Sequence, residues 1–444
     1  MFQRKILSKL NSWLMSDYRK PLIIRGARQT GKTTAVRMLA QNIPGYMEIN
    51  LEAPGEKSIF EKDLPVKDLI SALRLKNNIS VPHKESLLFL DEIQASPNAI
   101  SYLRFFYENI PELPVIASGS LLEAYIYKAG INFPVGRVEQ LYIYPLTFSE
   151  YLEALNKQEM LSVLRKTPFP DYALSALYEE YTRYTIFGGM PEILQQLCRG
   201  KTIEELQSTY FSLLISFQDD VSKYSSGSTM RQVITHCFSS IPNYTGERIN
   251  FSGFGNSSYK SREIGEALRT LQRAMLIDLV YPTSSIESPI KQNLKKHPKL
   301  FFLDSGLLAY ALNAQSELFG SSDLNKHFKG IIAEQQTAQT LKATGNKLLF
   351  WTREANASNA EVDFIKQVGD KLIPIEVKSG STGRLRSLHS FMERCPHNFA
   401  IRIYSGPVRI DELKTTEGKI FKLMSIPHFV SEFIDEYSNW FLHR

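Results

Sequence analysis

The sequence has little cysteine and no long apolar stretch. Its only three cysteines, Cys198, Cys237 and Cys395, lie far apart and form no C-x-x-C pair. This spacing argues against a disulfide framework and a zinc site, and it favours a reducing compartment. No uninterrupted apolar run approaches the ~18 residues of a membrane span, and the N-terminus lacks the apolar core of a secretory signal. We therefore expect a cytoplasmic protein without a membrane span.

A strong excess of charge of either sign is also missing. Lys and Arg together number 52 against 46 Asp and Glu, which gives a net charge of +6. Affinity for nucleic acid must therefore be argued from local clusters. Apolar residues make up 43% and charged residues 22%, which excludes a disordered or collagen-like chain. At about 100–200 residues per domain, 444 residues predict two to four domains.

Short apolar runs followed by polar residues recur in the first third of the chain. They cover residues 21–24, 87–90 and 114–117, with helical patterns between them and an amphipathic helix before the first. Such runs are typical of a parallel sheet buried on both faces, so we predict an α/β fold. From 148 to 217 the pattern is helical, broken by Gly188-Gly189-Met190-Pro191, and predicts a helical lid.

Residues 26–33 match the phosphate-loop pattern G-x-x-x-x-G-K-[ST] between a predicted strand and a predicted helix. Gly26 and Gly31 let the backbone wrap the phosphates, Lys32 reaches the outer phosphates, and Thr33 can ligate magnesium. We therefore expect a bound nucleotide together with Mg²⁺. We assign phosphate binding to Gly26, Ala27, Arg28, Gln29, Thr30, Gly31, Lys32, Thr33 and Thr34.

Two carboxylates follow the second apolar run, at the carboxyl edge of the predicted sheet. Asp91 would hold magnesium through water, and Glu92 would orient or deprotonate the attacking water; an acidic helix cap is the alternative. Ser118 and Ser120, after the third run, could sense the terminal phosphate or simply form a turn. Arg137 could stabilise charge in its own or a neighbouring subunit, or be a solvated surface residue.

Residues 258–299 carry a helical pattern, a short strand at 277–281 and a second strand at 299–303 that could close a hairpin. This order is the layout of a winged helix, and the segment is rich in Lys and Arg, including Lys299. We predict contacts with DNA phosphates, although a winged helix that only packs against other domains would also leave these residues solvated. The DNA-binding candidates are Lys260, Arg262, Arg269 and Arg273.

The last third of the chain contains a D-x(12)-E-x-K spacing, formed by Asp363, Glu376 and Lys378 on a predicted hairpin with Gly369-Asp370 at its turn. Glu334, on an upstream helix, could add a third carboxylate, and Glu361 could be a ligand or a salt-bridge partner. Carboxylates that hold magnesium beside a lysine are the minimum set for metal-assisted phosphodiester hydrolysis. The same acids could instead form surface ion pairs in a nuclease-like fold kept for binding.

Eight motifs along the chain carry a family resemblance. In chain order they are RGARQTGKTT (25–34), LDEIQ (90–94), SGS (118–120), GRV (136–138), PLTFSEY (145–151), GGMPE (188–192), FLDSGL (302–307) and IEVKSG (375–380). Together they resemble prokaryotic AAA-type ATPases that carry a C-terminal domain of unassigned function. The resemblance implies an AAA-type module that binds ATP with Mg²⁺, a winged-helix segment and a C-terminal region similar to PD-(D/E)xK nucleases.

The sequence thus predicts an ATPase core at 1–147, a helical lid at 148–217, a winged helix at 218–310 and a nuclease-like α/β domain at 311–444. Its first functional hypothesis is an ATP-hydrolysing protein that couples its nucleotide state to DNA engagement, to which the C-terminal domain could add metal-dependent cleavage. The protein would be a homo-oligomer if Arg137 acts across a subunit interface. The second is a nucleotide-switched interaction protein whose nuclease-like domain is inactive. A small-molecule kinase is disfavoured, because Glu92 fits a water-activating base.

Overall fold

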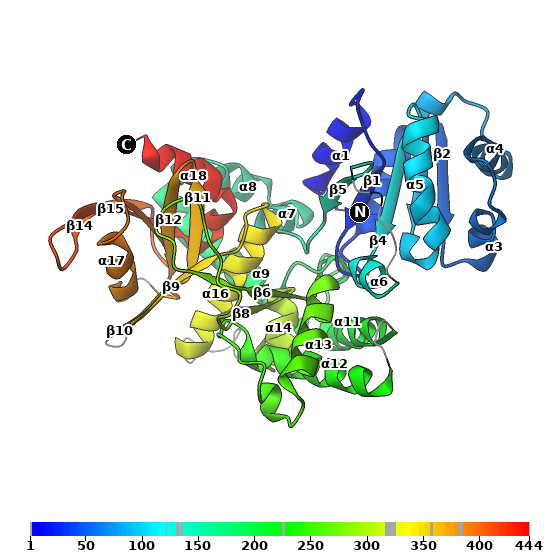
Figure 1. Cartoon of the computed structure of the whole chain (residues 1–444). Coiled ribbons are helices and arrows are strands. Elements are labelled where there is room, and N and C mark those ends of the chain that lie inside the picture. The colour runs from blue at the N-terminus through cyan, green and yellow to red at the C-terminus, as the bar shows by residue number, and fades with distance from the viewer. Residues whose placement is uncertain are drawn as a thin grey trace. The chain divides into compact units, whose positions relative to one another are not determined.

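The computed structural model describes residues 2–120, 122–129, 134, 136–223, 227–315, 326–355, 358–380 and 385–443 (Figure 1). The chain forms two compact units, each discontinuous in sequence. The first contains Met1–Tyr144, Asp219–Ser228 and Arg273–Leu276, and the second contains Pro145–Gln218, Thr229–Gln272 and Ile277–Arg444.

The first unit contains a parallel five-stranded sheet in the order β2-β3-β4-β1-β5. Three of its strands coincide with the apolar runs of the sequence, so the predicted parallel sheet is confirmed. The strands are β1 (Leu22–Arg25), β2 (Gly45–Asn50), β3 (Ser86–Asp91), β4 (Val115–Gly119) and β5 (Glu139–Tyr142). The helices are α1 (Ile6–Leu14), α2 (Lys32–Leu39), α3 (Pro54–Lys57), α4 (Val66–Lys76), α5 (Pro97–Asn109) and α6 (Leu122–Ala129).

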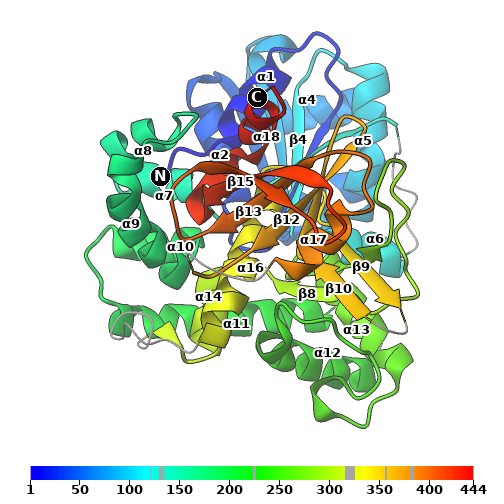
Figure 2. The ribbon, with the colours of Figure 1, turned by 90° about the vertical axis from the view of Figure 1, so that its left-hand side faces the viewer.

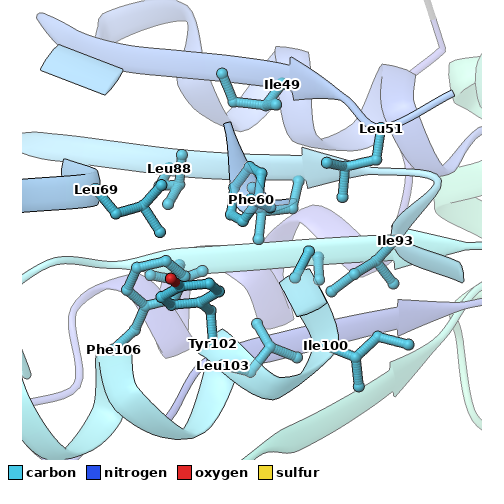
Figure 3. Packing of buried hydrophobic residues seen from close by; sticks show 14 of the residues in the cluster. Ile49, Leu51, Phe60, Leu69, Leu88, Ile93, Ile100, Tyr102, Leu103 and Phe106 are labelled. Atoms are coloured by element: carbon cyan, nitrogen blue, oxygen red, sulfur yellow. The ribbon is translucent and has the colours of Figure 1, made fainter. Parts of the chain in front are cut away.

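Alternate residues of the central strands feed two separate hydrophobic cores, because successive side chains of a strand point to opposite faces. Leu88 of β3 packs with residues of α4 and α5 such as Leu69 and Leu103 (Figure 3), and Leu90 belongs to the same core. Phe89, between them, belongs to the other core, which is formed with α1 and α2. Both faces of the sheet are therefore covered, which explains why these strands read as unbroken apolar runs.

Residues 148–217 are helical, as predicted, but they belong to the second unit rather than to the ATPase core. The Ser149 backbone N–H and hydroxyl donate to the two carboxylate oxygens of Glu432 at 2.9 and 2.7 Å, near the C-terminal end of the chain. The start of α7 thus contacts the C-terminal segment. They are α7 (Phe148–Ala154), α8 (Gln158–Leu164), α9 (Leu174–Phe187), α10 (Pro191–Leu197) and α11 (Ile203–Lys223).

The next segment has the predicted order of a helix followed by a hairpin. Ile264, Leu268 and Leu271 form the buried stripe of α13, at the spacing of an amphipathic helix. Strands β6 and β8 then pair antiparallel, with Ile277 opposite Phe302. The elements are α12 (Ser228–Ser240), α13 (Ser261–Arg273), β6 (Ile277–Val280), β7 (Pro282–Thr283), β8 (Lys299–Phe302) and α14 (Ser305–Ala311).

The C-terminal part contains a mixed sheet in the order β11-β12-β13-β15-β14, whose strands β12, β13 and β15 run side by side in Figure 2. The predicted hairpin is confirmed as β11 and β12, joined at Gly369-Asp370. Strands β10 and β9 form a separate small sheet with β7. The bounds are α16 (Lys326–Ala343), β9 (Phe350–Ala355), β10 (Ser358–Val362), β11 (Phe364–Val368), β12 (Lys371–Val377), α17 (Arg386–Met392), β13 (Phe399–Tyr404), β14 (Arg409–Lys414), β15 (Ile420–Pro427) and α18 (Ile434–Leu442).

The sequence predicted that no segment is long and apolar enough to span a membrane. Among the described residues, none of the helices combines the length and apolar character needed to cross a bilayer.

Candidate functional site

The phosphate loop connects β1 to the N-terminus of α2 at the carboxyl edge of the parallel sheet. Gly31 caps the helix with a φ of 95°, a conformation that a residue with a Cβ adopts only with strain. At Gly26 a Cβ would lie 2.5 Å from the carbonyl oxygen of Ile143. The path of the backbone therefore requires glycine at both positions. The N–H groups at the start of α2, directly after Gly31, are the kind of donors that bind phosphate.

Lys32 is buried and folds back over this loop. Its ammonium donates to the carbonyl oxygens of Gly26 at 3.0 Å and Ala27 at 2.9 Å. Burial lowers the pKa of Lys32 to about 8, although the negative charges of Glu92 and Asp91 oppose this shift. The ammonium therefore lies inside the loop, beside the two carboxylates that the sequence assigned to ATP chemistry.

Two arginines connect the loop to other parts of the first unit. Arg4 donates to the carbonyl oxygens of Thr30 at 3.0 Å and Tyr144 at 2.8 Å. Arg28, inside the loop, forms an ion pair with Asp220, whose side chain is 8% exposed. These contacts tie the loop to segments that are distant in the sequence.

Asp91 lies at the centre of a hydrogen-bonded network. The Thr33 hydroxyl donates to Asp91 Oδ2 at 2.8 Å, and the buried Ser118 hydroxyl donates to Asp91 Oδ1. A hydroxyl and a carboxylate at this separation are oxygen ligands of the kind that magnesium prefers. Thr33 and Asp91 therefore fit a magnesium ion, and Ser118 positions Asp91.

Glu92 follows Asp91 with a φ of 52°, so the chain turns sharply after β3. Its Oε2 accepts from the Gln94 amide at 2.5 Å and from the Ser120 hydroxyl at 3.4 Å. Gln94 is buried against Gly119, where a Cβ would lie 2.5 Å from Gln94 Oε1. The role of Gln94 was missed from the sequence, although it closes the LDEIQ motif.

Comparison with family models supports the same interpretation: an AAA domain family matches residues 18–152, which cover the sheet, the phosphate loop and both carboxylates. The chain contains an AAA-type P-loop ATPase domain. Two further models match residues 178–318 and 329–429, and both describe domains of unknown function, DUF8612 and DUF4143. A search of proteins with curated functions found no match.

Similar solved structures include the Walker-type ATPase PABY2304 of Pyrococcus abyssi, at 15% identity and a TM-score of 0.44, covering 70% of this chain and 96% of that one. The ORC2 protein of Aeropyrum pernix is 15% identical at a TM-score of 0.29, with 71% and 94% covered. The STAND protein PH0952 of Pyrococcus horikoshii is 13% identical at 0.29, with 77% and 45% covered. Since these TM-scores are below 0.5, the assignment of the AAA domain rests on the family model and the site geometry.

The structure corrects the expectation that Arg137 contacts the nucleotide of its own chain. Arg137 precedes β5, which pairs with β1 so that Glu139 lies opposite Leu22 and Tyr142 opposite Arg25. Arg137 is therefore at the amino edge of the sheet, whereas the phosphate loop follows the carboxyl edge. Its guanidinium is 48% exposed and donates to Glu108 at 3.0 Å. A role across a subunit interface stays a prediction.

The four DNA-binding candidates occupy different environments. Lys260 and Arg262 are exposed at the start of α13. Arg269 is half-exposed and lies 3.7 Å from the Glu266 carboxylate, and Arg273 is only partly exposed and is grouped with the first unit. Lys260 and Arg262 therefore remain the better candidates for phosphate contacts.

Lys299, which the sequence places among the basic residues of the winged-helix segment, is buried and is therefore not available for contacts with DNA. Its side chain is 4% exposed, and its ammonium lies 2.6 Å from Glu334, 2.7 Å from Glu361 and 3.6 Å from Asp363. Burial alone would lower the pKa of Lys299, but the three carboxylates outweigh this effect and raise it. We call Lys299 and these three acids the Lys299 cluster.

The remaining residues of the predicted nuclease motif lie beside this cluster on β12. Asp363 Oδ2 accepts from the Val377 backbone N–H at 2.8 Å, and Lys378 donates to Glu376 Oε1 at 2.6 Å. Burial raises the pKa of Glu334 to about 7 and that of Glu376 to about 8, the nearby Asp363 charge adding to both shifts. The spacing thus brings Asp363 near the end of β12, as predicted, but Asp363 lies between β10 and β11 and not within the hairpin.

As arranged, these acids do not fit a metal ion. Within the described ranges no three His, Cys, Asp or Glu side chains are placed to hold one. The ammonium of Lys299 lies between the carboxylates of Glu334 and Glu361, where an ion would have to bind. We therefore derive no metal-dependent step from Glu334, Asp363 or Glu376.

Two motifs without a role in the sequence analysis meet at Asp304. This buried carboxylate accepts four hydrogen bonds, from the backbone N–H groups of Gly189 at 2.7 Å, Gly306 at 3.0 Å and Leu307 at 3.1 Å, and from the Gln339 amide at 3.1 Å. A Cβ at Gly188 would lie 2.0 Å from Asp304 Oδ1. The GGMPE and FLDSGL motifs therefore form one packed structural joint.

Proposed function

We propose that the protein is an ATP-hydrolysing AAA-type protein that engages DNA under the control of its bound nucleotide. The observation that carries the ATPase assignment is the hydrogen-bonded chain from Thr33 through Asp91 to Ser118, beside the buried ammonium of Lys32. These groups sit where β3 and β4 end next to the phosphate loop. This placement is what phosphoryl transfer to water requires.

Each residue has a distinct task in this proposal. Magnesium, held by Thr33 and Asp91, would neutralise charge on the outer phosphates. Lys32 would leave the loop carbonyls and contact the phosphates. Glu92, restrained by Gln94, would orient or deprotonate the attacking water, a role that a small-molecule kinase does not need.

DNA engagement is supported by the exposed basic residues of the helix and hairpin segment. Lys260 and Arg262 lie at the exposed start of α13, and Lys291, Lys295 and Lys296 are exposed in the connection between β7 and β8. Exposed basic side chains on a helix and an adjacent hairpin can contact phosphates in and beside a groove without reading sequence.

The second candidate function is a nucleotide-switched interaction protein whose nuclease-like domain does not cut. The Lys299 cluster favours it over metal-dependent cleavage, because its acids already neutralise an internal cation. Both candidates share the ATPase, and they differ in whether DNA is the partner.

The ATPase is tested by following phosphate release with Mg²⁺-ATP. Lys32→Ala should lose nucleotide binding, and Glu92→Gln should keep it while turnover falls by about 10²–10⁴-fold, the usual contribution of a general base. Lys67→Ala, at an exposed position on α4, is the matched lysine control and should behave as wild type. Full turnover in Glu92→Gln would contradict the assigned role.

DNA engagement is tested by fluorescence anisotropy with a labelled duplex over a range of salt, with ADP or a non-hydrolysable ATP analogue bound. Replacing both Lys260 and Arg262 by Ala should weaken binding and reduce the salt slope by about 2, one for each lost phosphate contact. The same double change at Arg199 and Lys201, also exposed in the second unit, is the control. Equal binding by both variants, or no effect of nucleotide, would favour the interaction-protein candidate.

A further inference from the structure

Lys299 is unusual because its charge is buried among acids from separate segments of the fold. Lys299 opens β8, after Pro298. Its side chain contacts Glu334 on α16, Glu361 on β10 and Asp363 between β10 and β11. Its ammonium also lies 5.2 Å from the centre of the Phe350 ring, a distance at which an aromatic face attracts a cation. Each of these contacts thus stabilises a positive charge at the same point of the fold.

The position of that charge is incompatible with a divalent ion at the same acids. Magnesium and similar ions bind oxygens at about 2.0–2.6 Å, and the ammonium is already 2.6 and 2.7 Å from Glu334 and Glu361. An ion held by these oxygens would lie next to the ammonium, in a site with little water to screen the repulsion. Lysine and ion therefore exclude each other.

The lysine that belongs to the D-x(12)-E-x-K spacing is a different residue. Lys378 pairs with Glu376 at 2.6 Å, and its side chain is 24% exposed. Lys299 is thus an additional cation that comes from a separate segment and fills the acidic cluster. The acids in turn explain how Lys299 can be buried, since an isolated buried charge is strongly disfavoured.

We propose that the ammonium of Lys299 is the resident cation of this acidic cluster, so that the C-terminal domain of the wild-type chain takes up no divalent metal there and does not hydrolyse phosphodiesters through it. Removing the lysine side-chain charge converts the cluster into a site for a divalent cation such as Mn²⁺. The inference goes beyond the proposed function and does not depend on the ATPase.

The test measures Mn²⁺ binding to the full chain without nucleotide, from the loss of the free-Mn²⁺ electron paramagnetic resonance signal. Wild type should show no binding that depends on Asp363. Lys299→Met should bind one Mn²⁺ per chain, with an apparent Kd at least about tenfold tighter than wild type, because affinity follows the ligand charge left available. The Lys299→Met/Asp363→Asn double variant should lose that site.

Lys378→Met is the matched control, since it removes a lysine charge next to the cluster but leaves Lys299 in place. It should bind no more Mn²⁺ than wild type. A gain as large as that of Lys299→Met would overturn the proposal, because net charge alone would then control binding. A folded Lys299→Met protein that binds no Mn²⁺ would also overturn it, since the acids would then form no ion site.

Lys299→Met leaves three acids facing one another and could prevent folding. The variant Lys299→Met/Glu361→Gln removes one of those charges and serves as the second test, with the same expected gain. The comparison of wild type with Asp363→Asn needs no change at Lys299. A Mn²⁺ site in wild type that disappears in Asp363→Asn would overturn the proposal, and equal, negligible binding by the two proteins would support it.

Discussion

The buried carboxylate of Asp304 offers the sharpest test of how the second unit is held together. In Asp304→Ala, four donors lose their acceptor: the N–H groups of Gly189, Gly306 and Leu307, and the Gln339 amide. An unsatisfied buried donor costs about 1–3 kcal/mol. Four donors at the lower end give a loss of about 4 kcal/mol in the free energy of unfolding, a value reached only when a buried network is broken.

Asp304→Asn provides a graded comparison. An amide keeps one acceptor oxygen, which can serve the Gly306 and Leu307 N–H groups that now bond Oδ1. Its NH₂ group would then face the two donors that now bond Oδ2, so roughly half of the loss, about 2 kcal/mol, should remain. Asp370→Ala, an exposed change in the turn between β11 and β12, should have no measurable effect.

The assay is urea denaturation followed by circular dichroism and tryptophan fluorescence. Trp13 belongs to the first unit and Trp351 to the second, so fluorescence reports on both. A transition that shifts with a bound ATP analogue belongs to the first unit and serves as an internal reference. A loss below about 1.5 kcal/mol in Asp304→Ala, or the same loss in Asp304→Asn, would refute the assignment of Asp304 as an acceptor of four buried hydrogen bonds.

Two further outcomes are expected. Gly26→Ala places a Cβ 2.5 Å from the Ile143 carbonyl oxygen, so it should abolish ATP binding and lower the free energy of unfolding by about 1–3 kcal/mol. Gly55→Ala, where the new Cβ meets open space, should change neither quantity. Calorimetric titration with ATP measures the binding of both variants. Burial lowers the pKa of His428 to about 4. The folded chain therefore resists protonation of this ring, and the free energy of unfolding should fall as the pH drops from about 6.5 towards 4. His428→Gln should therefore remove up to about 3 kcal/mol of the acid-induced loss of stability, as measured by urea denaturation from pH 7 to 4, and an unchanged loss would contradict the shifted pKa.

The phosphate loop could be predicted from the sequence because its chemistry is local. The residues from Gly26 to Thr33 are contiguous, and the apolar runs that place Asp91 and Ser118 beside them are strands buried on both faces. Parallel pairing brings the ends of such strands to one edge. The sequence pattern was therefore enough to predict which edge of the sheet carries the site.

The Lys299 cluster could not be predicted in the same way. A lysine in a segment rich in Lys and Arg is expected to be solvated, and its acidic partners begin 35 residues later along the chain. Only the tertiary packing of β8 against α16 shows that this charge is buried. A weak signal exists, since Lys299 directly precedes the apolar run Leu300–Phe302 in a fully buried strand.

The position of Arg137 also depended on information that the motif lacks. Gly136-Arg137 follows the carboxylate motif in sequence, but the register of β5 against β1 decides which edge of the sheet the arginine occupies. Register is set by pairing over the whole sheet and not by the residues next to the arginine.

The discontinuous make-up of the first unit has a practical consequence for work with fragments. A fragment ending at Tyr144 would contain the whole parallel sheet and the phosphate loop, but it would lack Asp219–Ser228. The Arg28 guanidinium, within the phosphate loop, would then lose Asp220 as its partner. In such a fragment the positive charge of Arg28 would be unpaired with Asp220, so kinetic constants measured on it would not describe the loop of the intact chain.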